Sequence, residues 1–219
     1  TITLELTSGE GIYTYLLNPL IVVAGKKYEL TGIPVGAYAV KSDGSLVLNS
    51  DIPENLTDNE KRSYIAVAII DEEERFMISK SSAKGSWGIR PQTICEKQYT
   101  GYRRGMSDMV GKENTDRILS EINLSYSGIG EELISYRKSS VFKDWYIPSA
   151  GQMYCRLYQK NKLAIKNVLS KIGHAHTASN YWTSTEYDKD MAWYITVNGD
   201  TGYNYKDISS YRVLFMRDF

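Results

Sequence analysis

The stretch WYIPSAGQMYCRLYQKNKLAIKNVLSKIG, residues 145–173, has the clearest helical pattern in the chain. Ser149 is a candidate N-cap, and Gln152 occupies the capping-box position three residues later. From Lys162 onward, apolar residues recur with helical spacing and stop at Gly173, a residue type that commonly ends helices. This apolar stripe consists of Ile165, Val168, Leu169 and Ile172. The pattern predicts helices over the stretch that follows Ser149.

Two shorter helices are predicted upstream, at residues 112–122 and 130–138. The first, KENTDRILSEI, has one apolar face formed by Ile118, Leu119 and Ile122. In the second, GEELISYRK, the pattern is shorter but also helical.

Strand patterns fill most of the remaining sequence. Residues 1–33 hold three of them, TITLEL, IYTYLL and LIVVAGKKYELTG. The segment GAYAVKSDGSLVL predicts a hairpin around Ser42-Asp43-Gly44, and SYIAVAIIDEEERFMISKS predicts two strands joined by an acidic turn. Residues 180–219 return to short strands, whereas residues 51–62 and 81–111 are predicted loops. Because helices and strands occur in separate runs and do not alternate as βαβ units, the sequence predicts an α+β fold.

Composition narrows the classes of function. The chain has 219 residues and a formal net charge of zero, which argues against electrostatic steering toward nucleic acid. The longest apolar run, YIAVAII at residues 64–70, is too short for a membrane span and reads as a buried strand. A strand-like pattern that begins at the first residue, without an initiator Met, leads us to expect that the chain is part of a longer protein.

Few residues suggest catalysis or metal binding. His174 and His176 stand two apart, but spacing provides no third ligand, so a solvated loop is the preferred reading and a metal site the lesser one. No Ser-His-Asp arrangement, phosphate-binding loop or dinucleotide motif is evident, and no cofactor or metal is predicted. Acidic clusters such as DEEE read as turns, although a glycosidase pair could still come from distant segments. Cys95 and Cys155 could form a pair or be two free thiols.

Tyrosine is the unusual component. The chain has 18 Tyr against four Phe, and many lie near the C-terminus among Asn, Asp, Ser and Gly. Recognition loops favour this composition, since Tyr offers a rigid amphipathic surface and the small polar residues offer adaptable hydrogen bonds. A hairpin whose tyrosine hydroxyls simply face water is the alternative. Trp182 and Trp193 in the same region are predicted to be core residues.

Two long segments carry a family resemblance. They are DWYIPSAGQMYCRLY, residues 144–158, and SNYWTSTEYDKDMAWYITVNGDTGYNYKDISSYRVLFMRDF, residues 179–219. The recurring elements D-W-Y-[LI]-P-S-x-G-[EQ], Y-W-[ST]-S-T-E, A-W and Y-R-V-x-x-x-R-x-F resemble those of Bacteroidetes surface proteins with a C-type-lectin-like domain of the formylglycine-generating-enzyme type. Residues 111–119, GKENTDRIL, also look like an element of this family.

The resemblance implies an architecture. It implies an α+β, C-type-lectin-like fold over residues 34–219, with two main helices and small twisted antiparallel sheets. Residues 1–33 resemble the last strands of a fimbrillin-like β-sandwich module. The enzyme branch of this fold uses cysteines near the closing strand, and here YRVLFMRDF has none, so the resemblance implies a non-catalytic domain. The calcium-dependent sugar motifs of animal C-type lectins are absent as well.

The family also includes variable proteins of diversity-generating retroelements, in which adenine-directed mutagenesis diversifies codons near the C-terminus. Between Glu186 and Arg212 most residues are of the kind that an Asn-type codon yields. Lys189, Met191 and Lys206 cannot arise in that way and would be fixed by the template.

We therefore expect an adhesin-like, ligand-binding domain at the cell surface, anchored in the outer membrane through an upstream segment. Its partners would be a protein or glycan ligand on a cell, host or phage surface and upstream domains of the same protein, with no nucleic acid. Beneath the contact surface, Trp182, Trp193, Glu186, Arg212 and Arg217 would hold the loops. The predicted contact residues are Tyr187, Asp188, Asp190, Tyr194, Thr196, Asn198, Asp200, Thr201, Tyr203, Asn204, Tyr205, Asp207, Ser209 and Tyr211.

Two alternatives stay open. One is an enzyme of the formylglycine-generating type or a carbohydrate-active protein that uses paired acids. The other is a structural fimbrial subunit that polymerises through residues 1–33, with no role for residues 187–211.

Overall fold

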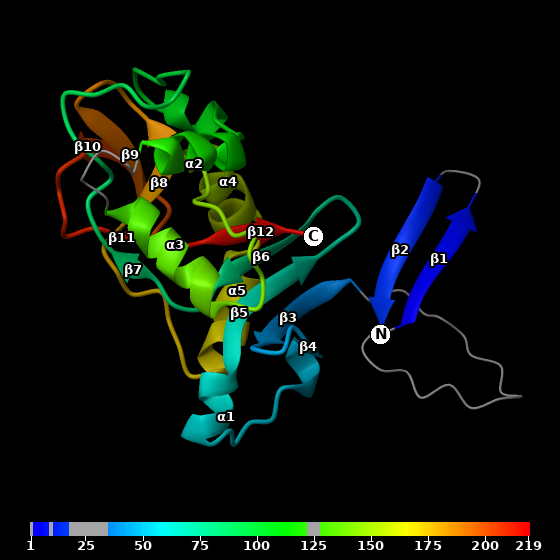
Figure 1. The fold of residues 1–219 in the computed structure, drawn as a ribbon. Helices are drawn as coiled ribbons and strands as arrows, with labels where there is room; N and C mark the ends of the chain where they lie inside the picture. The colour runs from blue at the N-terminus through cyan, green and yellow to red at the C-terminus, as the bar shows by residue number, and fades with distance from the viewer. Residues whose placement is uncertain (1, 9–10, 18–34, 122–127) are drawn as a thin grey trace, which may run out of the picture. The chain divides into compact units, whose positions relative to one another are not determined.

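The computed structural model describes residues 2–8, 11–17, 35–121 and 128–219, and its chain divides into two compact units, Thr1–Pro34 and Val35–Phe219 (Figure 1). In the N-terminal unit, β1 (Ile2–Ser8) and β2 (Gly11–Leu17) pair antiparallel, with Ile2 opposite Leu17. The first two predicted strands are thus confirmed, and the third, within LIVVAGKKYELTG, lies outside the described residues.

In the C-terminal unit, one sheet has the strand order β12-β6-β5-β3-β4. All its neighbours are antiparallel. The predicted hairpin at Ser42-Asp43-Gly44 joins the two strands on one side, and the predicted acidic turn joins the central pair. The strands are β3 (Gly36–Lys41), β4 (Leu46–Leu48), β5 (Tyr64–Ile70), β6 (Arg75–Ser79) and β12 (Met216–Asp218).

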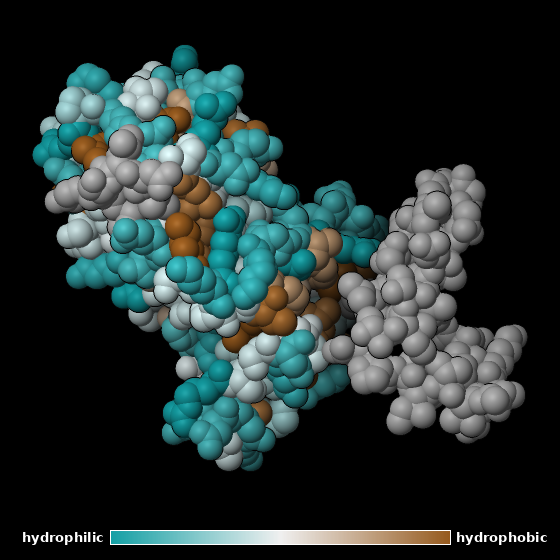
Figure 2. Space-filling model, in the orientation of Figure 1, coloured by the Kyte–Doolittle hydropathy of each residue, from teal (hydrophilic) through white to brown (hydrophobic). Residues whose placement is uncertain are grey.

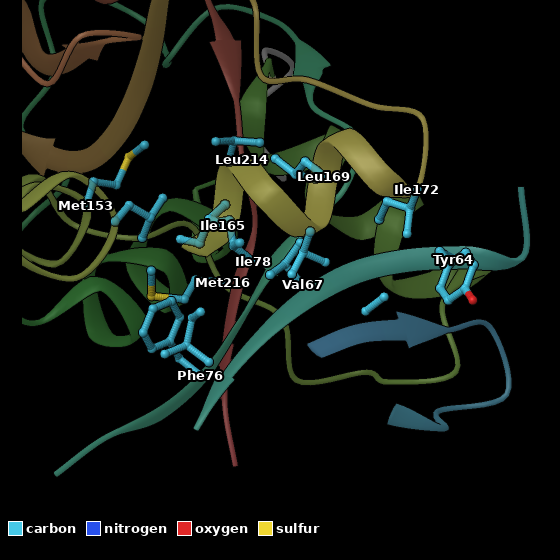
Figure 3. Packing of buried hydrophobic residues seen from close by; sticks show 14 of the residues in the cluster. Tyr64, Val67, Phe76, Ile78, Met153, Ile165, Leu169, Ile172, Leu214 and Met216 are labelled. Atoms are coloured by element: carbon cyan, nitrogen blue, oxygen red, sulfur yellow. The ribbon is translucent and has the colours of Figure 1, made fainter. Parts of the chain in front are cut away.

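Both faces of this sheet are buried, which explains why YIAVAII is apolar throughout. Successive side chains of a strand point to opposite faces. Val67 and Ile69 of β5 belong to one core cluster, whereas Ala68 and Ile70 belong to a second. The first cluster includes Ile165 and other residues of α5 (Lys162–Lys171), which packs along the sheet (Figure 3). The second includes residues of α2 (Gly111–Ser120) and α3 (Ile129–Ser139).

The second sheet has the order β10-β9-β8-β11-β7. It differs from the predicted small antiparallel sheets in one respect, since β11 lies parallel to β8. Parallel neighbours need a crossover connection, and residues 206–211 supply it by passing over the sheet from β10 to β11. The strands are β7 (Ala83–Lys84), β8 (Asn180–Glu186), β9 (Met191–Thr196), β10 (Thr201–Tyr205) and β11 (Arg212–Val213).

The predicted helical stretch after Ser149 forms as expected. Ser149 caps α4 (Ala150–Gln152), and both hydrogen bonds of the capping box to Gln152 are present. A π-helical segment, Met153–Lys160, continues the run and leads into α5. Gly173 ends it with φ +70°, a left-handed conformation that glycine adopts without strain. Together with the two sheets, these helices confirm the α+β class.

The predicted loop at residues 51–62 is partly wrong. It contains α1 (Asp58–Ser63), which Thr57 caps in a second capping box with Glu60. The helix was missed because none of its residues is buried, so no apolar stripe marks it. In the predicted loop at 81–111 the structure places β7 and a 3-10 turn, Arg104–Ser107.

The face of the C-terminal unit drawn in Figure 2 is mainly hydrophilic. On the face drawn in Figure 2, hydrophobic residues occur as small separate patches among hydrophilic ones. The large apolar or aromatic side chains that are exposed among the described residues include Tyr102, Leu163, Tyr203 and Tyr205.

Candidate functional site

The predicted contact segment, residues 187–211, covers the two outer strands of the second sheet and the turns that join them. β9 pairs with β8 on one side and with β10 on the other, and β10 is the edge strand. In this register Tyr203 lies opposite Trp193, and Gly202 lies opposite Tyr194. Each pair therefore shares one face of the sheet, and the two pairs lie on opposite faces.

Two buried tryptophans support the segment, as the sequence predicts. The indole of Trp182 donates to the Gly85 carbonyl over 3.1 Å, and that of Trp193 donates to the Tyr99 carbonyl over 2.9 Å. Gly105 packs so closely on Trp193 that an added Cβ would stand 2.5 Å from the indole. Both rings are therefore held from loops that are distant in sequence.

A fully buried ion pair joins Glu186, at the end of β8, to Lys206, just after β10. The Glu186 carboxylate also accepts the backbone N–H groups of Ile94, at 3.0 Å, and Cys95, at 2.9 Å. The Lys206 ammonium donates to the Gln92 carbonyl over 2.5 Å and lies 4.9 Å from the centre of the Trp87 ring. Since buried charges need several partners to offset desolvation, this network fixes the edge strand to the loop at 87–98.

The two arginines that the resemblance assigned to the framework are also paired. Arg212 donates to the hydroxyl and the carbonyl of Ser82. Arg217 forms an ion pair with Asp144, and its guanidinium lies 4.5 Å from the centre of the Phe142 ring. Both arginines therefore tie the closing strands to segments far away in sequence.

One face of the hairpin carries the exposed tyrosines. The rings of Tyr187 and Tyr203 stack with centroids 4.0 Å apart, and both lie near Trp193. Hydrogen bonding to Tyr187 raises the pKa of the Tyr203 phenol. Tyr203 is 45% exposed and Tyr205, which leaves β10 on the same side by alternation, is 48% exposed. We call Tyr187, Tyr203 and Tyr205 the outer tyrosine face.

Arg90 extends this face from a loop. Its guanidinium lies 4.3 Å from the centre of the Tyr205 ring and forms an ion pair of 2.7 Å with Asp207. Ser209, in the same crossover loop as Asp207, is exposed. Sequence reasoning missed Arg90, because 117 residues separate it from Asp207 and its own surroundings show no periodic pattern.

The other tyrosines pack on the opposite face. Tyr194 and Tyr211 have ring centroids 5.0 Å apart, and each also contacts Trp182. The amide of Asn204 donates to the Tyr211 hydroxyl over 2.9 Å. These three residues are half-buried, and burial raises the pKa of the Tyr194 phenol. They therefore pack mainly against their own sheet and the crossover loop.

Several predicted contact residues form turns. The Asp188 carboxylate accepts the backbone N–H groups of Asp190 and Met191, each over 2.8 Å, and Asp190 pairs with Lys189. At the opposite end of β9, the Thr196 hydroxyl accepts from the backbone of Asn198 and Asp200.

Asn198, Asp200 and Thr201 line a cavity of about 360 Å³ next to Tyr102. The predicted set thus occupies two faces and two turns, and none of its fourteen members is fully buried.

The fold resembles that of a fimbrial protein. That protein comes from Bacteroides ovatus ATCC 8483, and its crystal structure superposes on this chain with a TM-score of 0.61 at 17% sequence identity. The match covers 91% of this chain and 52% of that protein, so the chain spans about half its length. No protein-family model matches the chain, and no curated protein matches its sequence. At this identity the likeness establishes a shared fold.

The structure also places the two histidines and the two cysteines. His176 lies in the loop that the sequence predicted after the helix, but its ring is half-buried and not solvated, with Nε2 3.1 Å from the Ser79 carbonyl. Burial lowers its pKa to about 4. Cys95 and Cys155 are both free, and burial, with Glu186 nearby, raises the pKa of Cys95 to about 12. The described residues contain no group of three or more His, Cys, Asp or Glu able to hold a metal ion.

No helix among the described residues is long and apolar enough to span a membrane.

Proposed function

We propose that this chain belongs to a non-catalytic protein of the cell surface and acts as a structural subunit of a fimbria-like assembly. One observation carries the proposal: its fold is similar, over 91% of its length, to that of a fimbrial protein. Proteins of one fold can differ in function, so this support is by analogy. Anchoring in the outer membrane through an upstream segment belongs to the same proposal.

Surface labelling tests this role. An antibody against residues 35–219 should bind intact cells of the source bacterium as strongly as permeabilised cells. Extracts that have not been boiled should contain multimers that boiling dissociates. Labelling only after permeabilisation, or a monomer in every extract, would contradict a fimbria-like role.

A second candidate function is ligand binding by the outer tyrosine face. Tyr203 and Tyr205 support it, because both rings are about half exposed on an edge strand that the Glu186–Lys206 pair fixes. A tyrosine held in this way loses little conformational freedom on binding, and such residues often dominate interface energies. Asn198, Asp200 and Thr201 would extend the contact surface at one end.

A double variant distinguishes the two functions. Tyr203→Ala with Tyr205→Ala should reduce binding of the labelled chain to a glycan array or to intact cells at least about tenfold, if the face contacts a ligand. Val141→Ala with Leu163→Ala is the matched control, since both side chains are exposed outside the segment and outside the adjoining cavity. Unchanged binding in the double variant, with assembly intact, favours the purely structural role.

The finer family assignment is also part of the proposal: a C-type-lectin-like domain whose C-terminal segment is diversified by a retroelement. The burial of Lys206 supports it, because a template-fixed residue is expected to have a structural role. Lys189, which is exposed at a turn, has no comparable role. A reverse-transcriptase gene beside a near-copy of the 3′ end, differing only at adenines, would support diversification, and its absence would exclude that mechanism.

The absence of catalysis is proposed on chemical grounds. Thiolates, not thiols, act as nucleophiles, and the pKa of Cys95 at about 12 keeps this buried group protonated. We expect no turnover of sulfatase-derived cysteine peptides by the purified chain. Formation of formylglycine in such a peptide would contradict the proposal.

A further inference from the structure

A groove of about 370 Å³ runs along α5, next to the β9–β10 turn. Lys162, Lys166 and Ser170 form one wall, because residues four apart lie on the same side of a helix. Val197 and Asn198, at the β9–β10 turn, and the loop with the two histidines complete the lining. From Lys162 to Ser170 the helix rises about 12 Å, which sets the length of the groove.

The floor of the groove is apolar. Leu157, Ile165 and Leu169 line it, and each is at most 5% exposed. Ile165 and Leu169 belong to the core between α5 and the first sheet (Figure 3). An apolar molecule in the groove would therefore rest directly on core side chains, and burying its surface would be favourable.

The rim of the groove is positively charged. Two lysines carry this charge, because the two histidines of the lining have lowered pKa values and stay mainly neutral near pH 7, and the lining includes no carboxylate. Within the described part of the chain, neither lysine of the groove makes an ion pair. Lys162 lies 3.4 Å from the Asn198 carbonyl and 5.9 Å from the centre of the Tyr158 ring. Burial lowers the pKa of His174, and the charges of Lys80 and Arg212 add to this effect, as expected in electropositive surroundings.

We propose that this groove binds a small amphipathic carboxylate, with an extended body of about eight carbons on the apolar floor and its carboxylate at Lys162 and Lys166. The volume falls within the usual range of small-molecule sites, which combine apolar walls with a few charged groups. The carboxylate supplies the negative charge that the rim lacks. This site does not depend on the proposed function, and it lies on a different part of the unit from the outer tyrosine face.

Binding of octanoate to the full chain tests the proposal, with 1-octanol and octylammonium as probes of equal length. Titrations followed by ¹⁵N NMR should shift the backbone signals of Ala175, Val197 and Asn198. Octanoate should bind about three- to tenfold more tightly than 1-octanol, as expected for two exposed ion pairs. Octylammonium should bind more weakly than either. Equal affinity for the three probes, or shifts elsewhere only, would overturn the proposal.

Substitutions of the groove lysines test whether their positive charge binds the carboxylate. Lys162→Gln with Lys166→Gln should lower the affinity for octanoate to that for 1-octanol and leave 1-octanol unaffected. The matched control is Lys112→Gln with Lys138→Gln, which removes the same charge from exposed positions on α2 and α3 and should change nothing. Ser170→Phe should fill the groove from an exposed position and weaken both probes. Octanoate affinity that is equal in the two lysine double variants would show that the charge acts non-specifically and would refute the site.

Discussion

At the scale of single residues, Lys206 has the least expected environment. It stands between Tyr205 and Asp207, both of which are exposed, yet its side chain is fully buried and contacts Glu186, Gln92 and Trp87. A lysine in such a segment would ordinarily be assigned to the surface. In the sequence, Lys206 was distinguished only because a lysine cannot arise by adenine mutagenesis of an Asn-type codon. That argument does not predict whether the side chain is buried.

Lys206→Met is expected to lower the free energy of unfolding by about 3–5 kcal/mol, since it leaves Glu186 buried without its counter-charge. Chemical denaturation of the full chain measures this change. Lys189→Met, at an exposed position close by, should leave the denaturation midpoint almost unchanged. Combining Lys206→Met with Glu186→Gln should restore part of the loss. A loss below about 1 kcal/mol in Lys206→Met would contradict the assigned role of the pair.

Gly105→Ala should destabilise the chain by about 1–3 kcal/mol, because the new methyl would stand 2.5 Å from the Trp193 ring. Gly88→Ala is the control, since its nearest neighbour would be a side-chain atom of Ile94 at 3.5 Å, an ordinary contact. Midpoints of thermal unfolding compare the two variants. Equal midpoints would show that the 3-10 turn moves aside without cost.

His176 should make stability depend on pH. Its pKa of about 4 in the folded chain is below the ordinary value of 6.5, so the unfolded chain binds more protons between these values. Stability should therefore be fully present above about pH 6.5 and should fall by about 3 kcal/mol as the pH drops to about 4. His176→Gln should remove this component and leave the contribution of the carboxylates. Identical pH profiles of the two chains would contradict the burial effect.

At the scale of elements, strand alternation decides how the tyrosines are used. Tyr203 and Tyr205 leave β10 on one face, whereas Tyr194 of β9 faces Trp182 on the other. Composition predicted a tyrosine-rich segment but not this division, because the division depends on register and on the crossover of residues 206–211. The buried tryptophans were predictable, since large apolar rings in strands usually belong to the core.

The two capping boxes show what sequence can resolve at a helix start. Ser149 with Gln152 was found because an apolar stripe follows, whereas Thr57 with Glu60 was missed because α1 has no buried residue. The longer strands, the hairpins and the longer helices had periodic patterns. The loops of residues 81–111, which position Arg90 and Gly105, had none, so their contribution to the candidate site could not be inferred.

Thr57→Ala should destabilise the chain by about 1 kcal/mol through loss of the α1 cap. Hydrogen exchange should increase mainly at the amides of Asp58–Ser63. Thr57→Ser keeps the hydroxyl and should behave nearly as the unmodified chain. A similar loss in both variants would attribute the effect to the methyl group of Thr57 and not to the cap.

At the scale of the whole molecule, Val35–Phe219 has its own complete interior. Its first sheet is covered on both faces, and the two core clusters draw residues from both sheets and from α2, α3 and α5. A unit of this size can bury enough apolar surface to be stable. The sequence placed the division at residues 33/34, and the contacts divide the chain between Pro34 and Val35.

Residues 35–219 alone are therefore expected to fold, with an unfolding midpoint within a few degrees of that of the full chain. Circular dichroism during heating compares the two proteins. A cooperative transition in both is the expected result. A fragment that unfolds without cooperativity would show that residues 1–34 are needed for its stability.

The burial of the tryptophans has a practical consequence. All four, Trp87, Trp145, Trp182 and Trp193, are at most 2% exposed, and residues 1–34 contain none. Native indole emission should therefore be blue-shifted and insensitive to aqueous quenchers, and its red shift should report the opening of Val35–Phe219 alone. Tryptophan fluorescence therefore reports on Val35–Phe219. A change confined to residues 1–34 should leave the emission spectrum unaltered.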